Sequence, residues 1–154
     1  MFFFYQIIIS LLLILSPLII AFRIIKNKED KKRFIEKFSF PTNNRKKGSL
    51  IWFHGASVGE ILSIIPLIKK YEKKRSINQI LITSSTLSSS KVLKQFNFKK
   101  TIHQFYPIDH MIFVKKFLNH WKPNLALFVD SEIWPSMFYE LKNKRIPLVL
   151  LNAR

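Results

Sequence analysis

The sequence of 154 residues contains no cysteine, only three glycines and only nine acidic residues. The absence of cysteine excludes a disulfide framework and thiolate metal sites. Nine acids against 26 Lys and Arg give a formal net charge of +17, which predicts an anionic partner, either an acidic membrane face or nucleic acid. The G-x-G-x-x-G pattern and the Walker A motif are both missing, so dinucleotide and NTPase functions lack their main support.

An uncharged, almost wholly apolar stretch opens the chain. Its first 22 residues carry no charged side chain, and a helix needs about 20 apolar residues to cross a bilayer. Ten Lys and Arg follow between Arg23 and Lys47, so the positive-inside rule puts the rest of the chain in the cytoplasm. We predict a membrane anchor over residues 1–25 and a basic juxtamembrane segment and linker over 26–48. Pro17 leaves open whether the anchor spans the bilayer or lies in one leaflet.

The position of the positive charge favours one of the two anionic partners. Basic residues beside an apolar anchor bind acidic lipid, whereas the other lysines are scattered along the chain and are expected on solvated faces. The sequence therefore predicts a membrane partner and no nucleic-acid partner.

Beyond the linker, apolar runs alternate with helical patterns. The predicted strands are Leu50–Phe53, Gln79–Thr83, Ile102–Tyr106, Asn124–Val129 and Pro147–Leu151, and the predicted helices are Glu60–Lys73, Ser88–Phe96, Met111–Trp121 and Pro135–Lys142. A further basic helix is expected from Glu29 to about Phe38. Alternation over short connections indicates a mostly parallel sheet with right-handed crossovers, and continuous apolar strands indicate that both sheet faces are covered. We predict an α/β, Rossmann-like domain over residues 49–154.

The first strand is followed by a turn that carries the first candidate site. Gly55 and Gly59 are expected to supply backbone freedom, and Glu60 is expected in the first helical turn, facing the crevice at the strand's carboxyl end. Ser57 and Glu60 each have two interpretations. The pattern G-x-S-x-G matches the nucleophile elbow of serine hydrolases, with Ser57 as nucleophile, but serine is also a favoured helix N-cap. Glu60 is either a general base or an acid that stabilises the helix N-terminus.

A second candidate site follows the strand that ends at Val129. Asp130 and Glu132 stand before Trp134-Pro135, and in the predicted sheet they open onto the same edge as the turn of Glu60. Three carboxylates that converge there would position a base for hydroxyl activation; the alternative is two solvated loop acids. The hydroxyls between Thr83 and Ser90 suit phosphate or sugar oxygens, or simply a capped loop.

Taken together, these residues resemble the N-terminal half of the 3-deoxy-D-manno-octulosonic acid (Kdo) transferases of lipopolysaccharide synthesis. The resemblance lies in a set of short motifs that occur in order along the chain: Ile51–Glu60, Pro66-Leu67, Thr83–Thr86, Tyr106–Asp109, Phe117-Leu118, Asp130–Pro135 and Ile146–Arg154. The resemblance implies a GT-B-type glycosyltransferase that moves Kdo from CMP-Kdo to a lipid A precursor (lipid IVA). It implies no cofactor and no metal, and it places the protein at the cell inner membrane with the catalytic domain on the cytoplasmic side.

The resemblance also assigns roles to single residues. Glu60 matches the catalytic base of an inverting transfer, and Asp130 matches a transition-state acid that is normally Glu. Glu132 matches a supporting acid, and the candidates for substrate binding are Ser57, Gly59, Thr83 and Thr86. In the family, CMP binds to a C-terminal domain that this chain lacks, so we expect an acceptor-binding half that is inactive alone. Two other hypotheses remain: a serine hydrolase with Ser57 as nucleophile, and a non-catalytic basic membrane-associated protein.

Overall fold

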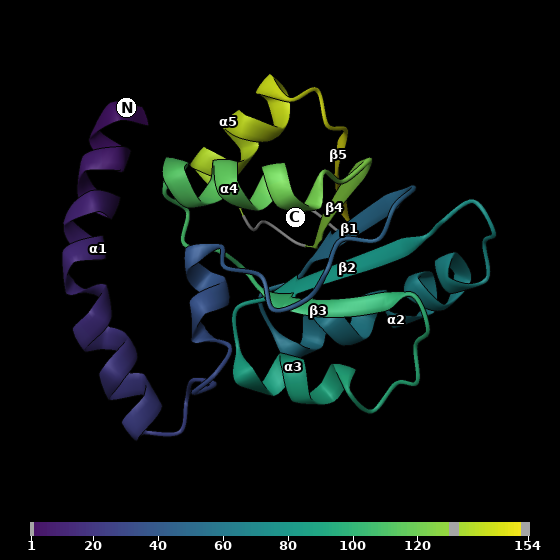
Figure 1. Ribbon diagram of the computed structural model, residues 1–154, viewed down its shortest axis with the longest axis horizontal. Coiled ribbons are helices and arrows are strands. Elements are labelled where there is room, and N and C mark those ends of the chain that lie inside the picture. Colours follow the sequence, from purple (N-terminus) through teal and green to yellow (C-terminus); the bar gives the residue numbers. More distant parts are fainter. Residues whose placement is uncertain (1, 130–132, 152–154) are drawn as a thin grey trace.

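A computed structural model describes residues 2–129 and 133–151 of the chain, and it consists of a long N-terminal helix beside an α/β domain (Figure 1). The long helix, α1, runs from Phe2 to Ile25. The only helical turn between α1 and the sheet in the described residues is the short 3-10 helix η1, Phe34–Phe38. The basic helix expected from Glu29 is therefore wrong in its first half. The Asp30 carboxylate accepts hydrogen bonds from the backbone N–H groups of Lys32 and Arg33 at 2.9 and 3.0 Å, which competes with helix formation.

The α/β domain contains a five-stranded parallel sheet in the order β3-β2-β1-β4-β5. Its strands are β1 (Leu50–His54), β2 (Gln79–Ser84), β3 (Thr101–Phe105), β4 (Leu125–Val129) and β5 (Leu148–Leu151). The intervening helices are α2 (Val58–Glu72), α3 (Leu87–Leu93), α4 (Met111–Trp121) and α5 (Pro135–Asn143). Helices α2 and α3 cover one face of the sheet, and α4 and α5 cover the other (Figure 1). The predicted alternation of strands and helices is confirmed.

The two faces of the sheet are filled by alternate residues of the same strands. In β1, Leu50 and Trp52 pack toward α4 and α5, while Ile51 and Phe53 pack toward α2 and α3. All five residues of β1 are buried. A strand that is covered on both sides must be apolar at every position, which is why the sequence shows no alternation there.

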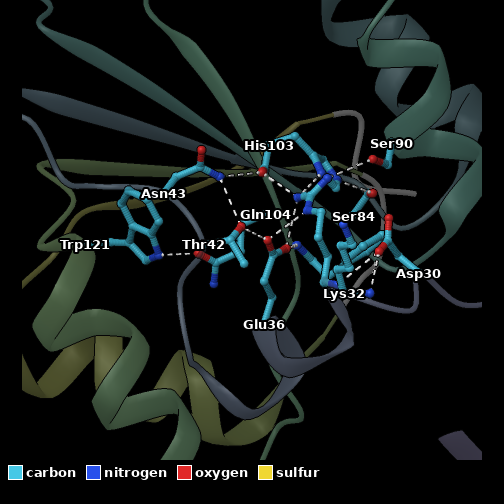
Figure 2. A network of polar contacts seen from close by, with 12 residues as sticks. Asp30, Lys32, Glu36, Thr42, Asn43, Ser84, Ser90, His103, Gln104 and Trp121 are labelled. Carbon is cyan, nitrogen blue, oxygen red and sulfur yellow. Dashed lines mark hydrogen bonds and ion pairs between the residues drawn. The ribbon is translucent and has the colours of Figure 1, made fainter. Parts of the chain in front are cut away.

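The outer edge of β3 is covered by side chains of the juxtamembrane segment rather than by another strand. Arg33 donates from Nη2 to the carbonyl oxygen of His103 at 2.7 Å, and the Glu36 carboxylate accepts the backbone N–H of Phe105 at 2.7 Å. Glu36 itself is fully buried and pairs with Arg33 through Nε and Nη2 at 2.8 and 2.9 Å. Figure 2 shows this network with Glu36, Thr42 and His103 at its centre. The segment therefore satisfies an edge that would otherwise expose unpaired backbone groups.

Candidate active site

The carboxyl ends of the parallel strands bring several predicted site residues to one edge of the sheet. The turn after β1 carries Ser57 and Glu60, the turn after β2 carries Thr86, and the loop after β3 carries Asp109. Because β4 runs parallel to β1, β4 also ends at this edge, at Val129. Asp130 and Glu132, which follow in the sequence, lie outside the described residues, so their roles stay predictions.

Glu60 is held at this edge by a reciprocal set of hydrogen bonds with the residues that precede α2. Ser57 caps the helix, accepting the N–H of Glu60 at 3.3 Å, and its hydroxyl donates to Glu60 Oε1 at 2.6 Å. The backbone N–H of Ala56 donates to Glu60 Oε2 at 2.8 Å. This is a capping-box arrangement. It fixes the direction of a partly exposed carboxylate, and since each carboxylate oxygen offers two acceptor sites, both oxygens keep capacity for a further donor.

The glycines of this turn serve a different purpose from the one expected. Neither Gly55 nor Gly59 has a positive φ, so the expected backbone freedom is wrong; the described glycine with a positive φ is Gly48, at +98°. A Cβ on Gly55 would lie 3.1 Å from Glu60 Cβ and 3.2 Å from the Cδ1 of Ile61. The position is therefore small because the start of α2 packs directly against it. Gly59 faces open space, where the atom nearest to an added Cβ is Ser57 Oγ at 4.0 Å.

The environment of Ser57 favours its interpretation as a helix cap over that as a nucleophile. Its backbone has φ −107° and ψ 166°, an ordinary extended conformation, whereas a nucleophile elbow holds its serine in a strained turn. Its hydroxyl hydrogen is directed to Glu60. The nearest histidine in sequence, His54, is fully buried and makes its hydrogen bonds to Thr83 instead.

The two threonines proposed for substrate binding lie at different depths. Thr83 is fully buried; its Oγ1 accepts the indole N–H of Trp52 at 2.8 Å and lies 2.9 Å from Nδ1 of His54. Thr86 is partly exposed and caps α3, accepting the N–H of Ser89 at 3.2 Å. Thr83 therefore lies beneath the edge, where it bonds to Trp52 and His54. The contact of Thr86 with a substrate stays a prediction.

The sequence interpretation missed the role of His54, which lies under this edge among aromatic rings. Its ring centroid lies 4.1 Å from that of Tyr106, 4.9 Å from that of Phe128 and 6.2 Å from that of Trp134. Burial lowers the pKa of His54 to about 3, so the imidazole is neutral at physiological pH. Within the part of the chain that the structure describes, its Nε2 atom has no hydrogen-bond partner. A histidine that directly ends an apolar strand was the available signal.

Asp109 is a second residue whose role becomes visible only in the structure. Its carboxylate is buried and accepts the backbone N–H groups of Ser136 and Met137 at 2.9 and 3.0 Å, which fixes the beginning of α5. The Tyr5 hydroxyl of α1 donates to the same carboxylate at 2.7 Å. Burial raises the pKa of Asp109, against the opposing effect of these hydrogen bonds. Asp109 therefore joins α1, the loop after β3 and the start of α5.

A cavity of about 270 Å³ opens beside this junction. Its lining includes Tyr5, Ile9, Lys37, Ser85, Tyr106, Asp109 and Trp134. The cavity thus combines one basic side chain with aromatic surface at the carboxyl edge of the sheet. Among residues 2–129 and 133–151 no group of three His, Asp or Glu side chains is placed to hold a metal ion.

Comparison with known proteins supplies the family. A sequence model described as 3-deoxy-D-manno-octulosonic-acid transferase (kdotransferase) matches residues 32–154. The chain belongs to this family. The Kdo transferase of Rickettsia bellii is 41% identical over 144 residues, covering 94% of this chain and 34% of the relative. A probable mitochondrial Kdo transferase of Arabidopsis thaliana is 39% identical over 142 residues, covering 90% and 32%. The Kdo transferase of Haemophilus influenzae is 31% identical over 149 residues, covering 94% and 35%.

The family assignment confirms the resemblance found in the sequence. The chain spans about a third of the length of these curated relatives. The parallel sheet with helices on both faces fits a Rossmann-like glycosyltransferase domain.

Proposed function

We propose that the protein transfers Kdo from CMP-Kdo to the sugar hydroxyl of a lipid A precursor such as lipid IVA, with inversion, and that this chain forms the acceptor-binding half. The observation that carries the proposal is the fixed, partly exposed Glu60 carboxylate at the carboxyl edge of a sheet in a Kdo transferase chain. The GT-B arrangement of the resemblance assigns CMP-Kdo to a second Rossmann-like domain that faces this edge. No cofactor or metal takes part in the proposed reaction.

Glu60 would act as the general base. An acceptor hydroxyl must lose its proton as its oxygen attacks the sugar, and a carboxylate within hydrogen-bond reach takes that proton. Ser57 and Ala56 hold both oxygens of Glu60 in place before the acceptor arrives, so little ordering of this group is left for the reaction itself. Asp130 and Glu132 are proposed to stabilise developing charge on the same edge.

We place the protein at the cell inner membrane, with the α/β domain on the cytoplasmic side. The support is one described helix, Phe3–Ile25, that is long and apolar enough to cross a membrane, followed by the basic segment from Arg23. A lipid acceptor suits such a location because its sugar headgroup lies at the membrane surface. The partners of the proposal are therefore the lipid A precursor, CMP-Kdo and the membrane.

The substitution Glu60→Gln tests the assigned base. It keeps the size and hydrogen-bonding capacity of the side chain but removes its basicity, so we expect Kdo transfer to fall by about 100-fold or more. The protein would be expressed from its complete reading frame, and transfer would be followed as the mass increase of lipid IVA. Binding of lipid IVA should stay close to wild type, since the turn keeps its shape.

Glu72→Gln provides the matched control. Glu72 ends the same helix α2 at its far end and bonds to the backbone of Lys100, remote from the proposed site, so its removal should leave the transfer rate unchanged. Wild-type transfer by the Glu60→Gln protein would refute the base assignment. Equal loss in both variants would indicate damage to α2 rather than to the chemistry.

A further inference from the structure

One face of helix α1 lies against the rest of the protein, and the other face is exposed. The residues with reduced exposure recur every three or four positions, as one face of a helix requires: Tyr5, Gln6, Ile9, Leu13, Ser16, Ile20, Arg23 and Ile24. The opposite face consists of exposed large apolar side chains from Phe3 to Ile25. Figure 1 shows α1 lying along one side of the α/β domain.

Polar contacts hold the first half of α1 to the domain. The Tyr5 hydroxyl donates to Asp109 at 2.7 Å, and Gln6 Nε2 donates to the Ser136 hydroxyl at 2.7 Å. One turn later, Ser10 Oγ lies 3.2 Å from Nε2 of His110. These are the uncharged polar side chains of the first ten residues, and all of them meet polar partners, either in the loop after β3 or at the beginning of α5.

Burial of Ile20 and an ion-pair bridge hold the second half of α1. Ile20 is 8% exposed, beside an apolar groove of about 370 Å³ that Phe34 and Phe38 of η1 also line. At the end of α1, Arg23 pairs with the buried carboxylate of Glu29 at 3.0 Å, and the same carboxylate pairs with Lys37 of η1 at 2.6 Å. Both halves of the helix are therefore joined to the rest of the protein.

This arrangement conflicts with a helix that crosses the bilayer. Tyr5 and Ile24 lie roughly 28 Å apart along the helix axis at 1.5 Å per residue, which is nearly the thickness of the hydrocarbon core, about 30 Å. A spanning α1 that kept these contacts would draw the polar loops of Asp109 and Ser136 into the hydrocarbon. Unpaired or charged groups are costly there.

We propose that α1 lies in the plane of the membrane surface, with its apolar face in the acyl chains of one leaflet and the α/β domain on the aqueous side. The occupant of this face is a leaflet that contains anionic lipid. Three exposed lysines just beyond the helix, Lys26, Lys28 and Lys31, lie where acidic headgroups would meet them. The cavity at the carboxyl edge, lined partly by Tyr5 and Ile9, then opens at the level of the headgroups. The inference concerns membrane geometry and does not depend on the transfer reaction.

Spin-label depth measurements test the proposal. Because the sequence contains no cysteine, each label attaches only to the cysteine that is introduced. Phe3, Ile14 and Ile25 are 72%, 73% and 78% exposed, and their spacing of eleven residues returns each to nearly the same face of the helix. Each would be replaced by Cys in turn, labelled with a nitroxide, and measured in vesicles of phosphatidylethanolamine and phosphatidylglycerol. We expect similar, shallow depths at all three positions. The proposal would be overturned if the label at position 14 lay deep and the labels at positions 3 and 25 lay shallow, and if the nitroxide at position 3 were reduced only by a reagent inside the vesicle.

A triple variant tests what holds the helix in this orientation. Tyr5→Phe, Gln6→Leu and Ser10→Ala together remove these polar contacts and leave Ser16 as the one polar side chain before Arg23. We expect α1 to become spanning in this variant, with Ile14 now the deepest label. An unchanged profile would show that these contacts do not orient the helix. Dipolar broadening of the labels without lipid would show that a second copy covers the face, which would also overturn the proposal.

Discussion

Two glutamates, Glu36 in η1 and Glu60 in the first turn of α2, have carboxylates with different surroundings. Glu36 is fully buried at the edge of β3 and is surrounded by donors: the Arg33 guanidinium, the N–H of Phe105 and the Thr42 hydroxyl. Glu60 is partly exposed at the carboxyl edge of β1 and has two donors, the Ala56 N–H and the Ser57 hydroxyl. The first is neutralised by a cation, while the second forms no ion pair with any of the described residues.

This difference assigns a structural role to Glu36 and supports the proposed catalytic role of Glu60. A carboxylate whose acceptor sites are filled and whose charge is paired has no capacity left for a ligand, so Glu36 serves to fasten the juxtamembrane segment to the sheet. Glu60 is oriented but not saturated, which is what a general base requires. Loss of Glu36 should therefore lower stability, and loss of Glu60 should lower the transfer rate.

The largest expected effect on stability comes from Glu36→Gln. It leaves the Arg33 guanidinium, only 19% exposed, without its carboxylate, and breaking such a pair costs roughly 3 kcal/mol of unfolding free energy. Urea denaturation would measure the loss. Transfer per folded molecule should stay near wild type, in contrast to Glu60→Gln.

Glu72→Gln is the matched control for this stability measurement as well. Glu72 accepts the N–H of Lys100 at 2.9 Å and the hydroxyl of Thr101 at 2.6 Å through Oε1, and the N–H of Lys99 at 3.2 Å through Oε2. It has no paired cation among the described residues, and the oxygen of a Gln side chain can still accept the first two bonds. We expect a loss of about 1 kcal/mol. Equal losses in the Glu36 and Glu72 variants would mean that the buried pair with Arg33 has no special weight.

The pH dependence of stability gives a smaller effect that again distinguishes the two regions. Burial lowers the pKa of His54, beneath the Glu60 edge, from 6.5 to about 3. Below pH 6.5 His54 takes up a proton in the unfolded chain but not in the folded chain. Its contribution to the free energy of unfolding is therefore fully present above that pH and is lost progressively toward pH 3. The slope is at most about 1.4 kcal/mol per pH unit for one group.

His103, in the Glu36 network, contributes in the same direction, since burial and then the Arg33 charge lower its pKa to about 3. It retains some exposed surface, so we expect His54 to dominate. The raised pKa of Asp109 acts in the opposite sense, favouring the folded state at low pH. Urea denaturation between pH 7 and 4 would give the slope, and His54→Gln should flatten it. An unchanged slope in that variant would show that His54 does not cause the pH dependence.

The fold could be predicted from the sequence because its strands and helices differ sharply in local pattern. Continuous apolar runs such as Leu50–Phe53 marked strands covered on both faces, and the apolar periodicity after Glu60 marked α2. The boundaries differ from the predicted ones by at most three residues, because helix ends are set by caps such as Thr86 at α3. The helix expected from Glu29 failed because the side chains there bond to the edge of β3, a partner distant in the sequence.

The candidate site was only partly predictable. The turn from Gly55 to Glu60 could be predicted, because its capping contacts join residues that are close together in the sequence. The role of Asp109 depends on Tyr5 and Ser136, which are 104 and 27 residues away, and no local pattern encodes such contacts. The depth of Thr83 likewise follows from its neighbours in adjacent strands, Trp52 and His54.

The smallest expected effect, Ser57→Ala, sharpens the comparison at the Glu60 edge itself. It removes the N-cap of α2, worth about 1 kcal/mol of unfolding free energy, and one of the two donors that orient Glu60. We expect a modest loss of stability and a partial loss of transfer, far smaller than in Glu60→Gln, because the carboxylate itself remains and Ala56 still holds Oε2.

Ser57→Thr should restore most of both losses, because threonine also caps helices and keeps the donor hydroxyl. The same pair of variants decides the serine hydrolase alternative. A nucleophilic Ser57 would react with a fluorophosphonate probe and lose that labelling in Ser57→Ala, whereas a cap whose hydroxyl donates to Glu60 should not be labelled at all. Labelling of the wild type that disappears in Ser57→Ala would make Ser57 the reactive group and would remove the distinction between a structural Glu36 and a chemical Glu60.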